Sequence, residues 1–180
     1  MTGKKQLSAQ RGIEAACILF QINSRTADIL NMARGAHMPE AYLHDTGAEL
    51  FCAEWRAFAH AVVTAGLMQY APNSVLMGYL RQTANLLAAA DAPAKAADPE
   101  AAEAALTAFV DGPFARYMPL LAHERQVECP ELFCRRLAEQ AGPDGGPMPD
   151  NHARARLAAV MAMLICAVRD KLEQYEILAE

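Results

Sequence analysis

The residues best suited to chemistry in this sequence are Glu54, Arg56 and His60, which lie close together on one expected helix. At about 3.6 residues per turn, Arg56 and His60 share one face, and Glu54 lies at the border of an aromatic face beside Trp55. A carboxyl group next to an indole loses hydration, which raises its pKa and lets it donate a proton. Together with His60, or with His44 just upstream, Glu54 could therefore act in general acid–base catalysis.

A structural interpretation competes with this one and is favoured by the pattern. In it, Arg56 pairs with Glu49 on the surface, His60 is solvated, and Glu54 lays its stem on apolar surface while its carboxylate stays in water. The sequence therefore assigns no residue a catalytic role.

A small-molecule pocket is the other site that the sequence allows. Aromatic side chains can form the walls of such a pocket, and a few charged groups can fix the orientation of the ligand. Glu54 and Arg81 are the polar anchors that we expect. The candidate pocket consists of Glu54, Trp55, Phe58, His60, Tyr79 and Arg81.

Motifs for metal or cofactor binding are not found in the sequence. It has no Glu-x-x-His or His-Glu-x-x-His pair, no Gly-x-Ser-x-Gly, no phosphate loop and no dinucleotide-binding glycine pattern. No two histidines share a helix face, so a metal site would need tertiary assembly. We expect no metal and no cofactor.

The elements that position these residues are all expected to be helices, because apolar residues recur at helical spacing and no segment alternates as a strand does. Thr46 and Glu49 predict a capping box at the start of the second helix. We expect residues 91–98 to form an alanine-rich flexible connector and residues 142–150 to form a loop rich in glycine and proline. Helices are expected over residues 7–34, 46–70, 75–90, 99–110, 113–124, 130–142 and 151–178.

The expected fold is an all-α, single-domain bundle of about six to seven helices over residues 1–180. Residues 13–30 are apolar on two sides of their helix, and the run Leu157–Val168 contains no polar residue. We therefore expect the first and last helices to be central. More apolar helix face is present than one bundle needs to cover, which predicts a homodimer and leaves room for a protein partner.

The net charge, the length of the apolar run and the number of cysteines bear on the partners and the compartment that we expect. A net charge of −5 argues against binding to nucleic acid, which needs a basic face. The apolar run Leu157–Val168 is too short for a membrane span, and no segment resembles a signal peptide. The odd number of cysteines, 5, favours reduced thiols. We expect a cytoplasmic protein that does not enter a membrane.

Two classes of function remain. The first, which the sequence favours, is a non-catalytic helical interaction protein, such as an adaptor, chaperone or regulatory subunit, that acts through apolar helix faces. Its 9 methionines suit adaptable contacts. The alternative is a helical bundle with a small-molecule pocket near Trp55, which would admit an enzyme.

Overall fold

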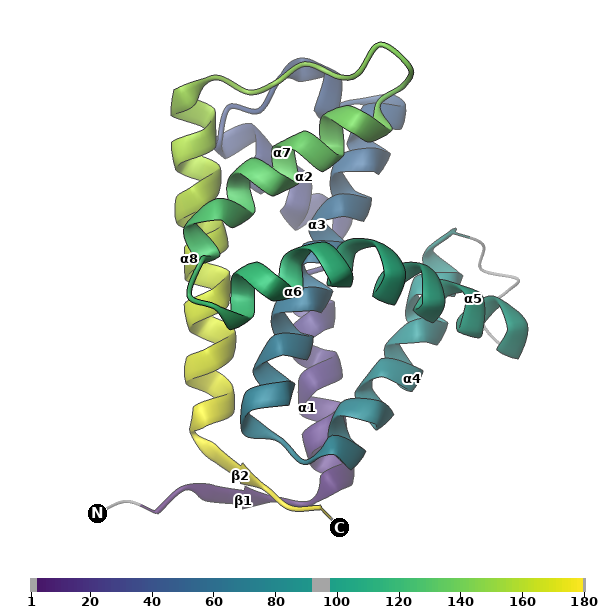
Figure 1. Ribbon diagram of the computed structural model, residues 1–180, viewed down its shortest axis with the longest axis vertical. Helices are drawn as coiled ribbons and strands as arrows, with labels where there is room; N and C mark the ends of the chain where they lie inside the picture. The colour runs from purple at the N-terminus through teal and green to yellow at the C-terminus, as the bar shows by residue number, and fades with distance from the viewer. Residues whose placement is uncertain (1–2, 92–97, 180) are drawn as a thin grey trace.

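The computed structural model describes residues 3–91 and 98–179 (Figure 1). The connector expected at residues 91–98 lies outside the described residues, except for its two ends. In the described part, no helix has both the length and the apolar character that crossing a membrane requires.

The chain is all-α, as the sequence predicted. The α-helices are α1 (Ala9–Ile22), α2 (Thr26–Gly35), α3 (Asp45–Tyr70), α4 (Asn73–Asp91), α5 (Pro99–Phe109), α6 (Ala115–Ala122), α7 (Cys129–Gln140) and α8 (Asn151–Glu173). Three short turns of helix are η1 (Glu40–Tyr42), η3 (Val110–Phe114) and η4 (Gln126–Glu128), and two short strands are β1 (Lys5–Leu7) and β2 (Tyr175–Ile177).

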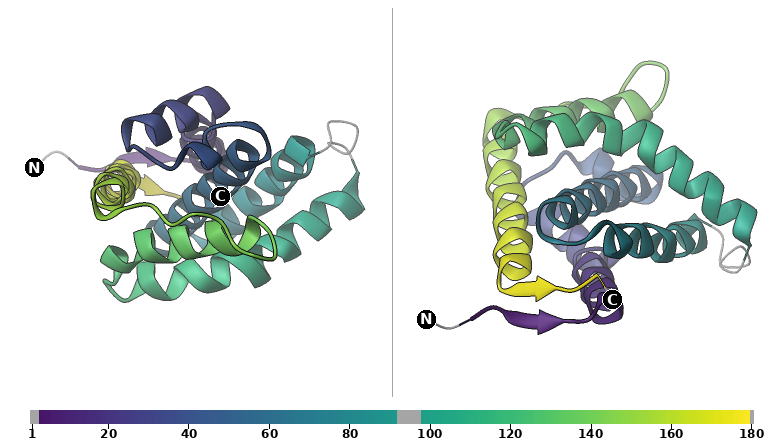
Figure 2. Two further views of the ribbon diagram at one scale, coloured as in Figure 1. Left: turned by 90° about the horizontal axis from the view of Figure 1, so that it is seen from above. Right: turned by 60° about the horizontal axis from the view of Figure 1, so that its bottom comes forward.

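Helix α3 is the centre of the fold. It contacts α1, α2, α4, α6, α7 and α8, and every side chain from residue 58 to residue 64 is buried. Helices α6 and α7 cross one side of α3, α2 lies on the other, and α8 runs along its flank (Figures 1 and 2). The expectation that the first and last helices are central is therefore wrong.

The error has a physical cause in the exposed side chains of α1 and α8. Ile18 and Ile22 of α1 are 55% and 48% exposed, and Met163 of α8 is 63% exposed. An apolar helical wheel shows which residues can be buried, but it does not show how many neighbours cover them. Both helices bury one stripe and leave apolar side chains on the surface.

The first helix breaks where the sequence predicted continuity from residue 7 to residue 34. Asn23 and Ser24 turn their side chains back to the carbonyl oxygens of Leu19 and Phe20, and this competes with the helical hydrogen bonds. The break frees two carbonyl groups, which accept hydrogen bonds from α3. Trp55 Nε1 donates to the Asn23 oxygen, and Arg56 Nε donates to the Ser24 oxygen.

The start of α3 also differs from the expected capping box. The helix begins at Asp45, its N-cap is His44, and no side chain caps it. The preceding turn η1 lies against this first helical turn, where a Cβ atom on Gly47 would overlap the carbonyl oxygen of Ala41. Because the helix begins at Asp45, Thr46 lies inside its first turn and is not its N-cap.

Segments α5, η3 and α6 follow one another without a break in the helical backbone. The sequence predicted an end at Asp111–Gly112–Pro113, and the structure instead has a wide π-helical turn there. Proline lacks the N–H group of a normal helical turn, and a single wide turn accommodates it.

The ends of the described chain meet in a parallel pair of strands, which the sequence analysis did not predict. Lys5 pairs with Tyr175, and Leu7 pairs with Ile177. The two strands lie beneath the bundle (Figure 1). The last helix accordingly ends at Glu173, earlier than the expected residue 178.

Candidate functional site

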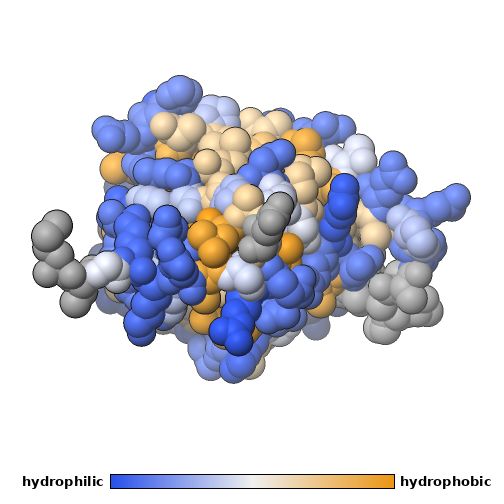
Figure 3. Space-filling model, turned by 90° about the horizontal axis from the view of Figure 1, so that it is seen from below, coloured by the Kyte–Doolittle hydropathy of each residue, from blue (hydrophilic) through white to orange (hydrophobic). Residues whose placement is uncertain are grey.

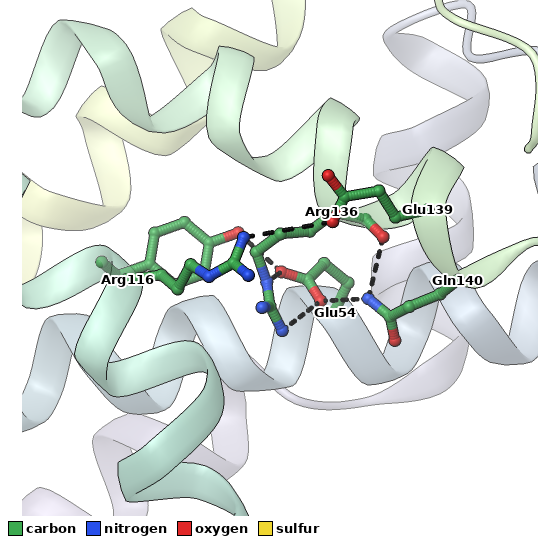
Figure 4. Close-up of polar contacts among 6 residues, drawn as sticks. Glu54, Arg116, Arg136, Glu139 and Gln140 are labelled. Carbon is green, nitrogen blue, oxygen red and sulfur yellow. Dashed lines mark hydrogen bonds and ion pairs between the residues drawn. The ribbon is translucent and has the colours of Figure 1, made fainter.

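Glu54 lies at the centre of a buried polar cluster that also contains Tyr117, Arg136 and Gln140, called here the Glu54 cluster (Figure 4). Arg136 Nε lies 2.7 Å from Glu54 Oε1, and Arg136 Nη2 lies 3.3 Å from Oε2. The Tyr117 hydroxyl donates to Oε1 at 2.7 Å, and Gln140 Nε2 donates to Oε2 at 2.9 Å. Each carboxylate oxygen therefore accepts two hydrogen bonds.

Three helices supply this cluster. Glu54 comes from α3, Tyr117 from α6, and Arg136 and Gln140 from α7, where they are one turn apart. The Glu54 side chain is 2% exposed, and that of Arg136 is 14% exposed. At the rim, Arg116 and Glu139 form a longer ion pair of 4.0 Å, and both of its side chains are about half exposed.

The electrostatics of the cluster favour one fixed protonation state. Burial raises the pKa of Tyr117 well above its usual value, and the charge of Glu54 raises it further. Burial lowers the pKa of Arg136, but the hydrogen bond and charge of Glu54 outweigh it, so the net shift is upward. Tyr117 stays protonated and Arg136 stays charged. The cluster thus joins α3, α6 and α7 through a network in which both carboxylate oxygens of Glu54 are satisfied.

The aromatic side chains predicted as pocket walls are part of the core. Trp55 is 5% exposed, and its ring lies 5.7 Å from that of Phe58 and 6.2 Å from that of Phe133. The Phe58 ring lies 5.3 Å from that of Tyr117. Neighbouring rings therefore fill the space beside Trp55 where a ligand was expected.

His60 is buried, and the expectation that it is solvated is wrong. Its Nε2 lies 2.7 Å from the Thr83 hydroxyl, and its ring centre lies 3.9 Å from that of Phe109 and 5.2 Å from that of Tyr79. Burial lowers the pKa of His60 to about 3, so the imidazole is neutral. Among the described residues, none bonds to His60 Nδ1 or to the Tyr79 hydroxyl.

The six residues of the candidate pocket face different neighbours. Glu54 faces α6 and α7, whereas His60 and Tyr79 meet Phe109 at the end of α5. Arg81 is exposed on α4 and lines a separate surface hollow with Asn85 and Glu103. The structure thus brings Glu54, Trp55 and Phe58 together on one side of α3 and His60 with Tyr79 on another.

The other members of the predicted acid–base group are engaged elsewhere. His44 pairs with Glu40 at 3.1 Å on the surface. The guanidinium of Arg56 donates to the Thr26 hydroxyl at 2.7 Å, in addition to its bond with the α1–α2 break. Glu49 lines a surface hollow beside Arg56. The partners of Glu54 were missed because Arg136 and Gln140, four residues apart, form an ordinary polar pattern on α7.

A groove open to solvent lies between α3, α6 and α8, and it is called here the α3–α6–α8 groove. Its volume is about 400 Å³. The right view of Figure 2 shows α6 and α8 beside α3, and Figure 3 shows apolar residues interspersed with hydrophilic ones on the lower face of the molecule. Apolar side chains line the groove, namely Val62, Met68, Met118, Leu121, Ile165 and Val168. Polar side chains line its remaining wall, namely Gln69, Glu124, Gln126 and Arg169.

The described residues contain no group of three or more His, Cys, Asp or Glu side chains arranged to hold a metal ion. Comparison with protein-family models, with curated proteins and with solved structures finds no match to this chain. Its function has to be argued from its own residues.

Proposed function

We propose that this chain is a non-catalytic helical interaction protein, such as an adaptor, chaperone or regulatory subunit, that acts through apolar helix faces and forms a homodimer. The observation that carries the proposal is the α3–α6–α8 groove. It is open to solvent, apolar side chains line part of it, and its exposed Met68 can adapt to the shape of a partner.

The surroundings of Glu54 and His60, the residues best suited to chemistry, also support a non-catalytic function. Glu54 is held by four hydrogen bonds inside the core, and His60 is enclosed by aromatic rings. A general acid or base needs to reach the proton that it transfers. Neither side chain has that access, and the space beside Trp55 that the alternative function requires is filled by Phe58 and Phe133.

Helix α8 adds further exposed apolar surface. Its run Leu157–Val168 buries Leu157, Met161, Leu164 and Val168 and leaves Met163 exposed on another side. The cysteines are all free thiols, which supports a reducing compartment such as the cytoplasm.

Selection from a random peptide library tests the proposal. Peptides are selected for binding to the wild type, and the Met68→Glu variant serves for counter-selection. We expect enriched peptides with apolar residues at helical spacing, because a helix lays one such face into a groove. Loss of Met68 should weaken their binding about tenfold or more, as removal of an interface anchor does.

Met148→Glu is the matched control, because Met148 is 48% exposed, close to the 51% of Met68, and does not line the groove. It should leave peptide binding unchanged. A selection that enriches no peptide, or only peptides that bind Met68→Glu equally well, would contradict a docking role for this groove.

A further inference from the structure

We propose that helix α5 is a pH-dependent flap, which Phe109 holds closed on the bundle and which is released when His60 takes up a proton. The proposal adds a conformational response to the interaction function and does not depend on it. It concerns His60 and the side chains that pack around it, none of which lines the α3–α6–α8 groove.

Helix α5 is attached to the rest of the fold mainly by one side chain. Of its residues, only Phe109 is buried, at 5% exposed. Figures 1 and 2 show α5 at the outer edge of the molecule. Alanine buries little apolar area, and three of the four partly buried side chains of α5 are alanines, namely Ala101, Ala102 and Ala105 beside Leu106. Phe109 is therefore the main anchor of α5.

The anchor packs directly on His60. The ring centres of Phe109 and His60 lie 3.9 Å apart, with their planes at 69°. Phe20 of α1 and Tyr79 of α4 also lie against the imidazole, with ring centres at 5.1 Å and 5.2 Å. Because α5 supplies the nearest of these three rings, its departure would let solvent reach His60.

Among the described side chains, none that faces His60 can neutralise a positive charge on it. Burial raises the pKa of Tyr79, and it raises that of Cys17 on α1 to about 11, so both groups are neutral. Arg56, one turn earlier on α3, is itself a cation. The charged residues that the surrounding elements carry elsewhere are exposed, namely Arg11 and Glu14 of α1, Arg81 of α4, Glu100 and Glu103 of α5, and Asp111 of η3.

A proton on His60 therefore opposes the closed position of α5. An unpaired charge is strongly unfavourable in a buried site, and burial accordingly lowers the pKa of His60 from 6.5 to about 3. With α5 released, water can hydrate the imidazolium. The closed position is thus fully favoured above about pH 6.5 and loses this advantage progressively as pH falls towards 3.

The closed position also leaves a polar atom of His60 unpaired. Nε2 lies 2.7 Å from the Thr83 hydroxyl, whereas Nδ1 has no hydrogen-bond partner among the described residues. A buried polar atom without a partner is destabilising, and it regains a hydrogen bond when water reaches it. This makes release of α5 less unfavourable than separation of a fully paired interface.

The segment after Phe109 is suited to act as the hinge. Val110–Phe114 form a wide π-helical turn that contains Pro113, and none of these residues is buried. Proline has no backbone N–H, so fewer helical hydrogen bonds have to break at this turn. Rotation here would carry α5 and Phe109 outwards while α6 stays docked through its buried Tyr117.

Hydrogen–deuterium exchange of the whole chain from pH 7 to pH 4, read by mass spectrometry, tests the proposal. A released α5 should exchange readily, because an isolated helix this short is marginally stable in water. After correction for the intrinsic exchange rate, peptides from α5 should exchange about tenfold faster per pH unit between pH 6 and pH 4, since release takes up one proton. Helix α7, whose apolar side is buried, is the control within the same molecule and should show no such slope.

Two variants test the roles of the individual residues. In His60→Gln, α5 should lose its pH slope, because glutamine has no proton to gain. The matched control is His123→Gln at an exposed histidine, which should keep the slope. In Phe109→Ala, α5 should exchange about tenfold or more faster than in the wild type already at pH 7, because its anchor is lost.

Equal pH slopes in α5 and α7 of the wild type would show unfolding of the whole domain and would overturn the proposal. A flat response of α5 in the wild type, or a slope that survives in His60→Gln, would overturn it as well. The wild-type comparison of α5 with α7 decides the question even where a variant fails to fold. Peptide binding at Met68 is measured separately, so failure of this proposal leaves the interaction function standing.

Discussion

The guanidinium of Arg136 neutralises the buried carboxylate of Glu54 through two hydrogen bonds across the interface between α7 and α3. Removing either charge alone leaves the other buried without its partner. Burying an unpaired charge is far less favourable than burying a pair, and replacing both partners with apolar groups removes the problem. The pair therefore makes the docking of α7 on α3 depend on two residues that are far apart in sequence.

Arg136→Met should destabilise the fold by about 3–5 kcal/mol at neutral pH, because Glu54 would lose its cation in a buried site. The double variant Glu54→Leu/Arg136→Met should recover part of that loss, because no charge is left unpaired but the buried Tyr117 hydroxyl loses its acceptor. Urea denaturation measures both. The control is Arg116→Met at the exposed pair with Glu139, for which we expect about 1 kcal/mol or less. Equal effects at the two arginines would contradict the central role of Glu54.

The neutral, buried His60 predicts a stability that falls with acidification. Its pKa is about 3 in the folded state against 6.5 as the ordinary value, so the unfolded chain takes up the proton first as pH falls. The contribution is fully present above the unfolded pKa and is lost between about pH 6.5 and pH 3. Several kcal/mol, as an order of magnitude, are at stake over that range.

The measurement is the difference in unfolding free energy between wild type and His60→Gln from pH 7 down to pH 4. That difference should shrink as pH falls, because glutamine has no proton to gain and the contributions of other groups cancel. The exposed His123 is the control, and His123→Gln should show no such trend. A difference that stays constant with pH would mean that His60 is solvated.

Two adjacent residues of α8 distinguish its covered and uncovered sides. Leu164 is 7% exposed and Met163 is 63% exposed. Leu164→Ala should cost about 2–5 kcal/mol through lost burial and a cavity. Met163→Ala should lie within about 0.5 kcal/mol of the wild type. Thermal unfolding at low protein concentration compares the two, and a large effect of Met163→Ala would show that this side of α8 is covered.

Gly47 predicts a steric effect at the start of α3. A methyl group there would overlap the Ala41 carbonyl, so Gly47→Ala should push η1 away and destabilise the fold by about 1–3 kcal/mol. A methyl group added at Gly35, at the end of α2, would have nothing within 4 Å of it, so Gly35→Ala should be neutral or slightly stabilising. Chemical denaturation of the two variants provides the comparison.

The features of this fold that the sequence contains are those that depend on residues close together along the chain. Asp98 and Asp150 cap α5 and α8, since their carboxylates accept from the backbone N–H groups of Glu100 and Ala153. Capping depends only on residues a few positions away, so sequence patterns contain it. Interactions across the fold are different, because Glu54 finds Tyr117 and Gln140 at separations of 63 and 86 residues.

The environment of the candidate site likewise depends on residues that are far apart in sequence. The helical wheel placed Glu54 at the border of the aromatic face, and the favoured interpretation kept its carboxylate in water. That interpretation is wrong, because Glu54 is 2% exposed. The prediction from the helical wheel that His60 is solvated is also wrong, because neighbouring elements cover the polar residues of a central helix as well as the apolar ones. Phe109, which covers it, belongs to α5 and approaches from a separate part of the chain. No periodicity within α3 contains that information.

The pairing of β1 with β2 has a consequence for the order in which the protein forms during synthesis. Gln6 and Glu176, opposite each other in the register, are 170 residues apart. At about 5–20 residues per second, a ribosome needs roughly 10–30 s to reach the second strand after the first. Throughout that interval β1 has no partner strand from its own chain. This small sheet therefore cannot close before its second strand has been made, and a nascent chain stalled before Tyr175 should keep Lys5–Leu7 accessible to proteases.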